Sequence, residues 1–136
     1  MLRAGGINWI AVLVAAVAFY AIGFVIYGLL IPPERWMALS GISAADMEAV
    51  GQNRMPFSVV MPLMTAGFMA LLFKWGSVTG ISKGAQWGVV VALASAVPGM
   101  LYGWVYGVGP IDMTLVDSAH LLLGHVAVGM ILGAWK

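Results

Sequence analysis

The chain has 136 residues, of which 62% are hydrophobic and only 8% are charged, and its formal net charge is +1. Soluble domains carry about 25% charged residues, and a small domain cannot bury this much apolar surface because its surface-to-volume ratio is large. The low net charge argues against a basic face for nucleic acid, and the absence of cysteine excludes disulfides and thiolate metal sites. We therefore predict an integral membrane protein whose main partner is the lipid bilayer.

Four apolar stretches reach the length of about 20 residues that a membrane-spanning helix needs. The first covers about residues 8–31 and stops at Pro32-Pro33, because proline cannot continue the helical hydrogen-bond ladder. It exceeds the apolar region of a secretory signal, which is about 7–15 residues long, so we expect a retained helix. The other stretches cover about residues 56–75, 85–106 and 113–135.

The connections between these stretches are short, except for the outward loop over residues 32–55. Inside this loop, Ser43-Ala44-Ala45-Asp46 resembles a capping box with Asp in place of Glu, which predicts a short helix over residues 43–50. Asp112 or Thr114 is expected to cap the last helix. The fold class is therefore all-α, a bundle of four transmembrane helices that forms a single domain over residues 1–136.

Lysine and arginine in short loops indicate the orientation of the bundle, because the more basic side faces the cytoplasm. One side would hold Arg3, Lys74, Lys83 and Lys136, and the other would hold Arg35 and Arg54. This distribution predicts both termini on the cytoplasmic side. We expect a multi-pass protein of the bacterial inner (cytoplasmic) membrane.

Small residues recur at a spacing of four in the last two stretches. They are Gly88, Ala92 and Ala96, then Gly99, Gly103 and Gly107, and finally Gly129 and Gly133. Such spacing lets another helix backbone approach closely. The pattern fits an interface between subunits, and it also fits packing inside the four-helix bundle, which needs such grooves in any case.

Apart from tyrosines, Asp117, His120 and His125 are the ionisable residues well inside a predicted span. A charge at that depth costs about 2.5–3.5 kcal/mol on insertion scales, so such groups usually face protein or water. Asp117 and His120 share one helix face, and a hydrogen bond between them would suit a polar pocket, a proton relay or a structural contact. His125 lies about 140° around the helix from His120, so the two cannot readily chelate one metal, and no metal site is predicted.

Tyr20 and Tyr27 lie seven residues apart on one face of the first stretch and could line the same polar cavity. Tyrosines at such places also commonly reach the headgroup level. No cofactor is predicted, and haem with His120 or His125 as its axial ligand is an alternative.

The sequence also carries a family resemblance, which is strongest in its first third. The residues that carry it are Asn8-Trp9-Ile10-Ala11-Val12, Tyr27-Gly28, Trp36-Met37, the acidic Asp46 and Glu48, and the ending Leu132-Gly133-Ala134-Trp135. Together they resemble the DUF1761 family, small bacterial membrane proteins with four spans and no established function. Members often have a D-x-x-x-H element early in the last helix, whereas the interval from Asp117 to His120 is one residue shorter. The resemblance implies the four-helix fold and supplies no reaction.

No phosphate-binding loop, nucleophile elbow or dinucleotide fingerprint is present in the sequence, so we favour a protein that is not an enzyme. We expect it to act by helix–helix association, as a homo-oligomer or as an accessory subunit of a larger membrane complex. The alternative is a small transporter or channel with a polar pocket at Asp117 and His120.

Overall fold

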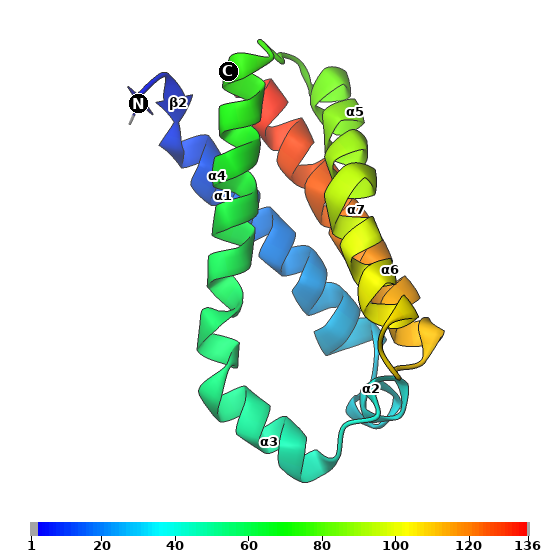
Figure 1. Cartoon of the computed structure of the whole chain (residues 1–136). Helices are drawn as coiled ribbons and strands as arrows, with labels where there is room; N and C mark the ends of the chain where they lie inside the picture. Colours follow the sequence, from blue (N-terminus) through cyan, green and yellow to red (C-terminus); the bar gives the residue numbers. More distant parts are fainter. Residues whose placement is uncertain (1–2, 136) are drawn as a thin grey trace.

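The computed structural model describes residues 3–135, apart from the side chains of residues 50 and 52. Lys136, which was counted for the orientation, lies outside the described residues. Four helical segments are long and apolar enough to cross a membrane: Trp9–Leu30, Met55–Trp75, Ile81–Val105 and Ile111–Ala134 (Figure 1). This confirms the predicted class, an all-α bundle of four membrane-compatible helices.

The chain begins with a small antiparallel hairpin in which β1 (Arg3–Ala4) pairs with β2 (Ile7–Asn8). Asn8 then caps helix α1 (Trp9–Gly23), because its side chain accepts a hydrogen bond from the Ala11 amide. The first span continues as the π-helical segment η1 (Phe24–Leu30) and ends where the backbone of Ile31 becomes extended.

The long connection between the first two spans contains two helices, α2 (Pro33–Ser40) and α3 (Ala44–Asn53), where the sequence predicted one. Pro33 suits the first turn of α2, where its missing N–H costs nothing, and Gly41 ends that helix in the left-handed region with φ 68°. The capping box before α3 is confirmed. The Asp46 amide donates to Ser43 Oγ (3.2 Å), and the Ser43 amide donates to Asp46 Oδ2 (3.3 Å).

The second and third spans each combine α-helix with another helical form. The second begins with the 3₁₀ segment η2 (Met55–Val59) and continues as α4 (Val60–Trp75). The third consists of α5 (Ile81–Val91), the π segment η3 (Ala92–Ala96) and α6 (Val97–Val105). Pro98 lies just after η3. Because proline has no backbone N–H, it cannot complete the α-helical hydrogen-bond pattern, and the π-helical hydrogen bonds of η3 lie directly before it.

The last span is a single helix, α7 (Ile111–Ala134). Pro110 occupies its N-cap position and no side chain bonds the first turn, so the expected cap by Asp112 or Thr114 is wrong. The reason is that the helix starts two residues earlier than the sequence suggested, because Pro110 fixes an extended backbone immediately before it.

The buried core occupies only one half of the bundle. Helix α7 packs against both α5 and α1, and α1 also packs against α4. The buried apolar side chains come mainly from α1 up to Phe19, from α4 between Pro62 and Phe73 and from the end of α7, with Ile7, Val78 and Ala92 in addition. We call this region the packed half, and it lies toward the two chain ends (Figure 1).

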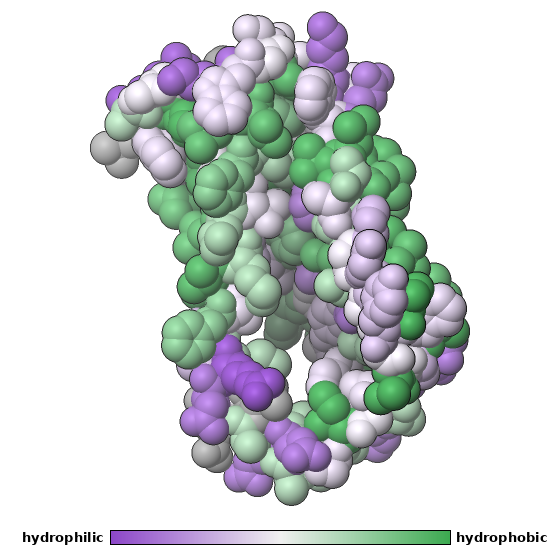
Figure 2. Space-filling view, in the orientation of Figure 1, coloured by the Kyte–Doolittle hydropathy of each residue, from purple (hydrophilic) through white to green (hydrophobic). Residues whose placement is uncertain are grey.

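The opposite half has little packing. Segments η1, η2 and α6 contain no buried residue, and we call these three segments the open half. Helices α1 and α4 diverge toward that end, where α2 and α3 connect the first two spans (Figure 1). We call these two connecting helices the strap. Figure 2 shows the surface hollowed there, with hydrophobic residues along the spans and hydrophilic residues at both ends. The latter distribution is typical of a chain that crosses a bilayer.

Candidate functional site

Three of the polar residues singled out in the sequence, Tyr27, Asp117 and His120, meet where the packed half joins the open half. Tyr27 Oη, on η1, donates a hydrogen bond to Asp117 Oδ1, on α7, with 2.5 Å between the oxygens. The bond connects residues 90 positions apart in the chain. Tyr27 comes from a π-helical segment, whose wider i→i+5 turns are frequent at functional sites.

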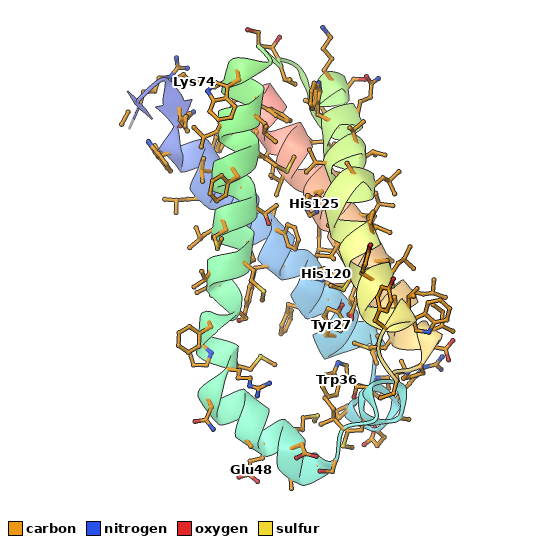
Figure 3. The ribbon with its side chains drawn as sticks, viewed as in Figure 1. Tyr27, Trp36, Glu48, Lys74, His120 and His125 are labelled. Carbon is orange, nitrogen blue, oxygen red and sulfur yellow. The ribbon has the colours of Figure 1, made fainter. Side chains whose placement is uncertain are left out.

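His120 packs beside this bond. Its ring stands edge-on to Phe19, with centroids 5.2 Å apart. It also stands edge-on to Tyr27, with centroids 5.3 Å apart, and Figure 3 shows where His120 and Tyr27 lie in the bundle. The Nε2 atom of His120 is buried and has no hydrogen-bond partner within the described part of the chain. It lies against Gly23, where a Cβ atom would come within 2.9 Å of it. The ring therefore occupies space that exists only because residue 23 is glycine.

The hydrogen bond that the spacing favoured between Asp117 and His120 is not found among the described residues. Asp117 bonds across to Tyr27 instead, and the His120 Nε2 faces the first span at Gly23. Both side chains thus face the neighbouring helix rather than each other. The spacing of two residues along one helix shows that they share a face, but their hydrogen-bond partners depend on the residues of the neighbouring helix.

His125 has a local role. Its Nδ1 donates to the carbonyl oxygen of Leu121 at 2.7 Å, and the residue is only 6% exposed. Its ring also stands against Phe19, with centroids 5.6 Å apart. Within residues 3–135, no three His, Asp or Glu side chains are grouped so that they could hold a metal ion.

Phe19 is the site residue that the sequence analysis missed. It contacts both histidines, and Gly124 opposite it leaves room for its ring, since a Cβ there would come within 2.7 Å of the ring carbons. The signal was present in the sequence, because Phe19, Gly23 and Tyr27 follow one another at a spacing of four. Such residues lie on one face of a helix.

Tyr20 does not join this cluster. It is 45% exposed, and its hydroxyl lies 3.5 Å from Ser58 Oγ on η2. The expected polar stripe that combined Tyr20 with Tyr27 is therefore divided between two places in the structure.

The small residues at a spacing of four also form two groups, one packed inside the bundle and one with open space around it. Gly88 and Gly129, together with Gly84 and Gly133, bring α5 and α7 into backbone contact, and the Gly80 amide donates to the Gly133 carbonyl oxygen at 2.8 Å. Ala92 is fully buried and Ala96 is half-buried. In contrast, Gly99 and Gly103 have open space where a Cβ would be, and Gly107 faces the Gly103 carbonyl of its own chain segment. Gly84 was missed because the predicted third span began at residue 85.

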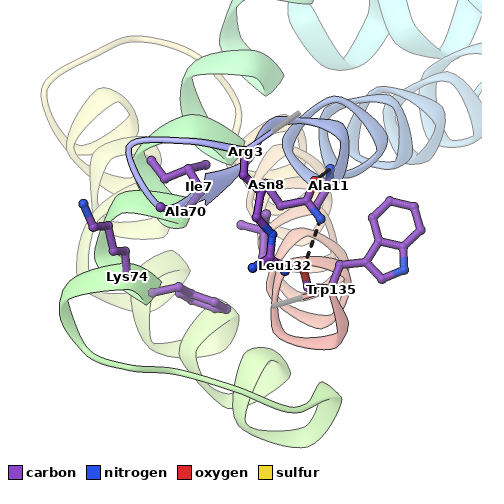
Figure 4. A pocket seen from close by; sticks show the side chains of 10 residues that line it. Arg3, Ile7, Asn8, Ala11, Ala70, Lys74, Leu132 and Trp135 are labelled. Carbon is purple, nitrogen blue, oxygen red and sulfur yellow. Dashed lines mark hydrogen bonds between the residues drawn. The ribbon is translucent and has the colours of Figure 1, made fainter. Parts of the chain in front are cut away.

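A small hollow of about 50 Å³ lies at the end that carries both chain ends (Figure 4). Arg3 and Lys74 contribute cations to its lining, and Asn8 Nδ2 donates to the carbonyl oxygen of Trp135 at 3.2 Å. This bond connects the beginning of the first span to the end of the last. The hollow has room for one or two water molecules, and we assign it a structural role.

No curated protein and no solved structure matches the chain. A family profile described as "Protein of unknown function (DUF1761)" matches residues 10–133. This match covers nearly all of the sequence, including all but the outermost residues of the first and last membrane-compatible helices, as well as Tyr27, Asp117 and both histidines. The chain therefore belongs to the DUF1761 family.

Proposed function

We propose that this protein works by helix–helix association in the membrane, as a homo-oligomer or as an accessory subunit of a larger membrane complex. The observation that carries the proposal is the confinement of the buried core to one half of the bundle. In that half four helices pack together, whereas η1, η2 and α6 contribute no buried residue.

Lipid alone can cover exposed apolar side chains, so exposure by itself does not imply a partner. Two features of the open half go further. Gly99 and Gly103 on α6 have nothing against them, although small residues at this spacing favour close backbone contact. The second is the hydroxyl of the half-buried Ser58 on η2, which donates to the Met55 carbonyl oxygen and lies 3.5 Å from the hydroxyl of the exposed Tyr20 on α1.

The same third span shows what this spacing does when a partner is present. Gly84 and Gly88, spaced four residues apart like Gly99 and Gly103, lie against the backbone of α7. We infer that α6 makes an equivalent contact with a helix from outside the chain.

Native mass spectrometry of protein extracted gently from its host membrane tests this proposal. Association predicts a homo-oligomer or a complex with foreign subunits, and Gly103→Leu should reduce either. Ala94→Leu, an exposed position outside the open half, is the matched control and should leave the complex intact. A monomer in the wild type, or complexes unaffected by Gly103→Leu, would overturn the proposal.

We also propose that the chain ends face the cytoplasm of a bacterium and that the strap of α2 and α3 faces outward. The support is the positive-inside rule. Arg3, Lys74 and Lys83 lie in segments at the end with the chain termini, whereas Arg35 lies in the strap and Arg54 directly follows it. Because the chain has no cysteine, single Thr79→Cys and Ala45→Cys variants can be labelled in whole cells. An impermeant maleimide should label Ala45→Cys alone, and the reverse pattern would contradict this orientation.

A second candidate function is the transfer of a proton or small polar solute past Tyr27, Asp117 and His120. It is favoured by one observation, the buried His120 Nε2 without a partner. Association remains the leading proposal, because Asp117 is already bonded to Tyr27. Flux into liposomes that is lost in His120→Ala and retained in the exposed-site control Tyr102→Phe would support transfer. Equal flux in all three proteins would reject it.

A further inference from the structure

We propose that a second hollow, at the strap end of the bundle, binds one phospholipid whose headgroup carries a phosphate and a primary ammonium. The hollow measures about 440 Å³, which lies in the range of about 300–1,000 Å³ of small-molecule sites. It is lined by the charged Arg35 and Asp112 and by apolar residues that include Leu30, Ile31, Leu115 and Val116.

The two charges in this hollow are of opposite sign. Arg35 lies in the first turn of α2 and Asp112 in the first turn of α7, both are exposed, and no ion pair joins them to each other. A guanidinium group binds phosphate oxygens through two parallel N–H donors, and a carboxylate accepts hydrogen bonds from an ammonium. A headgroup that has both groups can meet Arg35 and Asp112 together.

Helix electrostatics explains only one of these charges. Asp112 near the N-terminus of α7 is favourable for the helix dipole. Arg35 has the wrong sign for the same position on α2, so the dipole gives no reason for it to be there. A bound phosphate beside Arg35 supplies that reason.

The apolar lining places the ligand in the membrane. Leu30 is the last residue of the first span and α7 begins at Ile111, so the hollow lies at the headgroup level. Leu30 is 69% exposed and Leu115 is 56% exposed, and both belong to segments that are apolar enough to cross a membrane. A soluble phosphate compound would leave these side chains uncovered, whereas the acyl chains of a phospholipid would cover them.

The combination of charges also selects among lipids. An anionic headgroup without an ammonium group would be attracted by Arg35 but repelled by Asp112. A choline headgroup has a quaternary ammonium, which has no N–H to donate to Asp112. The hollow should therefore prefer phosphatidylethanolamine to phosphatidylglycerol and phosphatidylcholine.

Titration of the full-length, delipidated protein with these three lipids, all with dioleoyl chains, tests the proposal by native mass spectrometry. Phosphatidylethanolamine should bind with at least several-fold higher affinity than either other lipid. Arg35→Gln and Asp112→Asn should each weaken its binding by roughly tenfold, the factor for about 1.4 kcal/mol. Asp112→Asn should also raise the relative binding of phosphatidylglycerol.

The matched controls are Arg54→Gln and Glu34→Gln, which change exposed charges on the same side of the bundle but outside the hollow. Both should bind phosphatidylethanolamine like the wild type. Equal binding of the three lipids, or equal losses in the control and hollow variants, would overturn the proposal. The result is independent of the oligomeric state, which the same spectra report separately.

Discussion

At the residue scale, the hydrogen bond between Tyr27 and Asp117 explains how a carboxyl group is accommodated within a span. A charged or strongly polar group there is costly unless protein or water solvates it, and the Tyr27 hydroxyl provides that contact from the first span. The bond is also the direct polar contact that holds η1 to α7, since η1 has no buried side chain. We therefore expect it to contribute to stability as well as to the site.

Removing the Tyr27 hydroxyl should destabilise the protein more than changing its acceptor. Tyr27→Phe leaves Asp117 without this donor, whereas Asp117→Asn keeps an oxygen that can accept the bond. Hydrogen bonds inside membrane proteins contribute on average about 0.6 kcal/mol and at most about 1.7 kcal/mol. A double-mutant cycle measured by unfolding in mixed micelles should give a coupling in that range. Tyr102→Phe, on the exposed face of α6, should be neutral, and zero coupling would show that the bond contributes nothing.

The polar residues of the candidate site could be found from the sequence, but their pairing could not. Asp117, His120 and Tyr27 stand out because polar groups are rare in apolar stretches. The bond joins two segments that are far apart in the chain, and no periodicity within one helix contains that information. Gly23 shows the same limit, because its importance depends on the His120 ring placed against it from α7.

At the element scale, the contact between α5 and α7 is built from backbone rather than side chains. A Cβ on Gly129 would overlap the Gly84 carbonyl oxygen, and one on Gly133 would come within 2.5 Å of the Gly80 carbonyl oxygen. Neither obstacle is a flexible side chain that could move aside. The spacing of small residues predicted a close helix contact, and the structure assigns its first part to the interior of the bundle.

Replacing glycine by alanine should therefore have opposite effects at Gly129 on α7 and at Gly99 on α6. Gly129→Ala should force α5 and α7 apart and destabilise the protein by about 1–3 kcal/mol, the usual cost of overpacking. Gly99→Ala, which meets nothing within 4 Å, should be neutral or should stabilise the isolated chain by up to about 1 kcal/mol, because alanine is the better helix former. Thermal unfolding in detergent measures both changes. Equal losses in the two variants would contradict the assigned contact.

Some helix boundaries followed from the sequence and others did not. The four spans and the capping box before α3 follow from the apolar stretches and from Ser43 and Asp46. Helix α2 was missed, although Pro33 near its start and Gly41 just after its end are boundary signals. The π segments η1 and η3 could not be predicted, since their residues are as apolar as those of the α-helices beside them.

At the scale of the whole molecule, the division into a packed half and an open half is the main result for function. Helix count and loop length predict a bundle, but they do not say how far along the spans the helices stay together. In this chain the contacts between α1, α4, α5 and α7 hold the half near the termini, and the strap keeps the other ends of the first two spans apart (Figure 1). An association partner would therefore act on one half only.

Hydrogen exchange resolved by peptide should show the two halves directly. In a detergent-solubilised monomer, the amides of α6 and η1 should exchange faster than those of α5 and the second half of α7, because local opening costs least where few contacts must break. In native membranes, a partner on the open half should slow exchange in α6 and η1 and leave the packed half unchanged. Gly103→Leu should remove that protection, while Ala94→Leu should keep it. If α6 and α5 exchange alike in the monomer, the open half is as stable as the packed half, and the structural basis for association is lost.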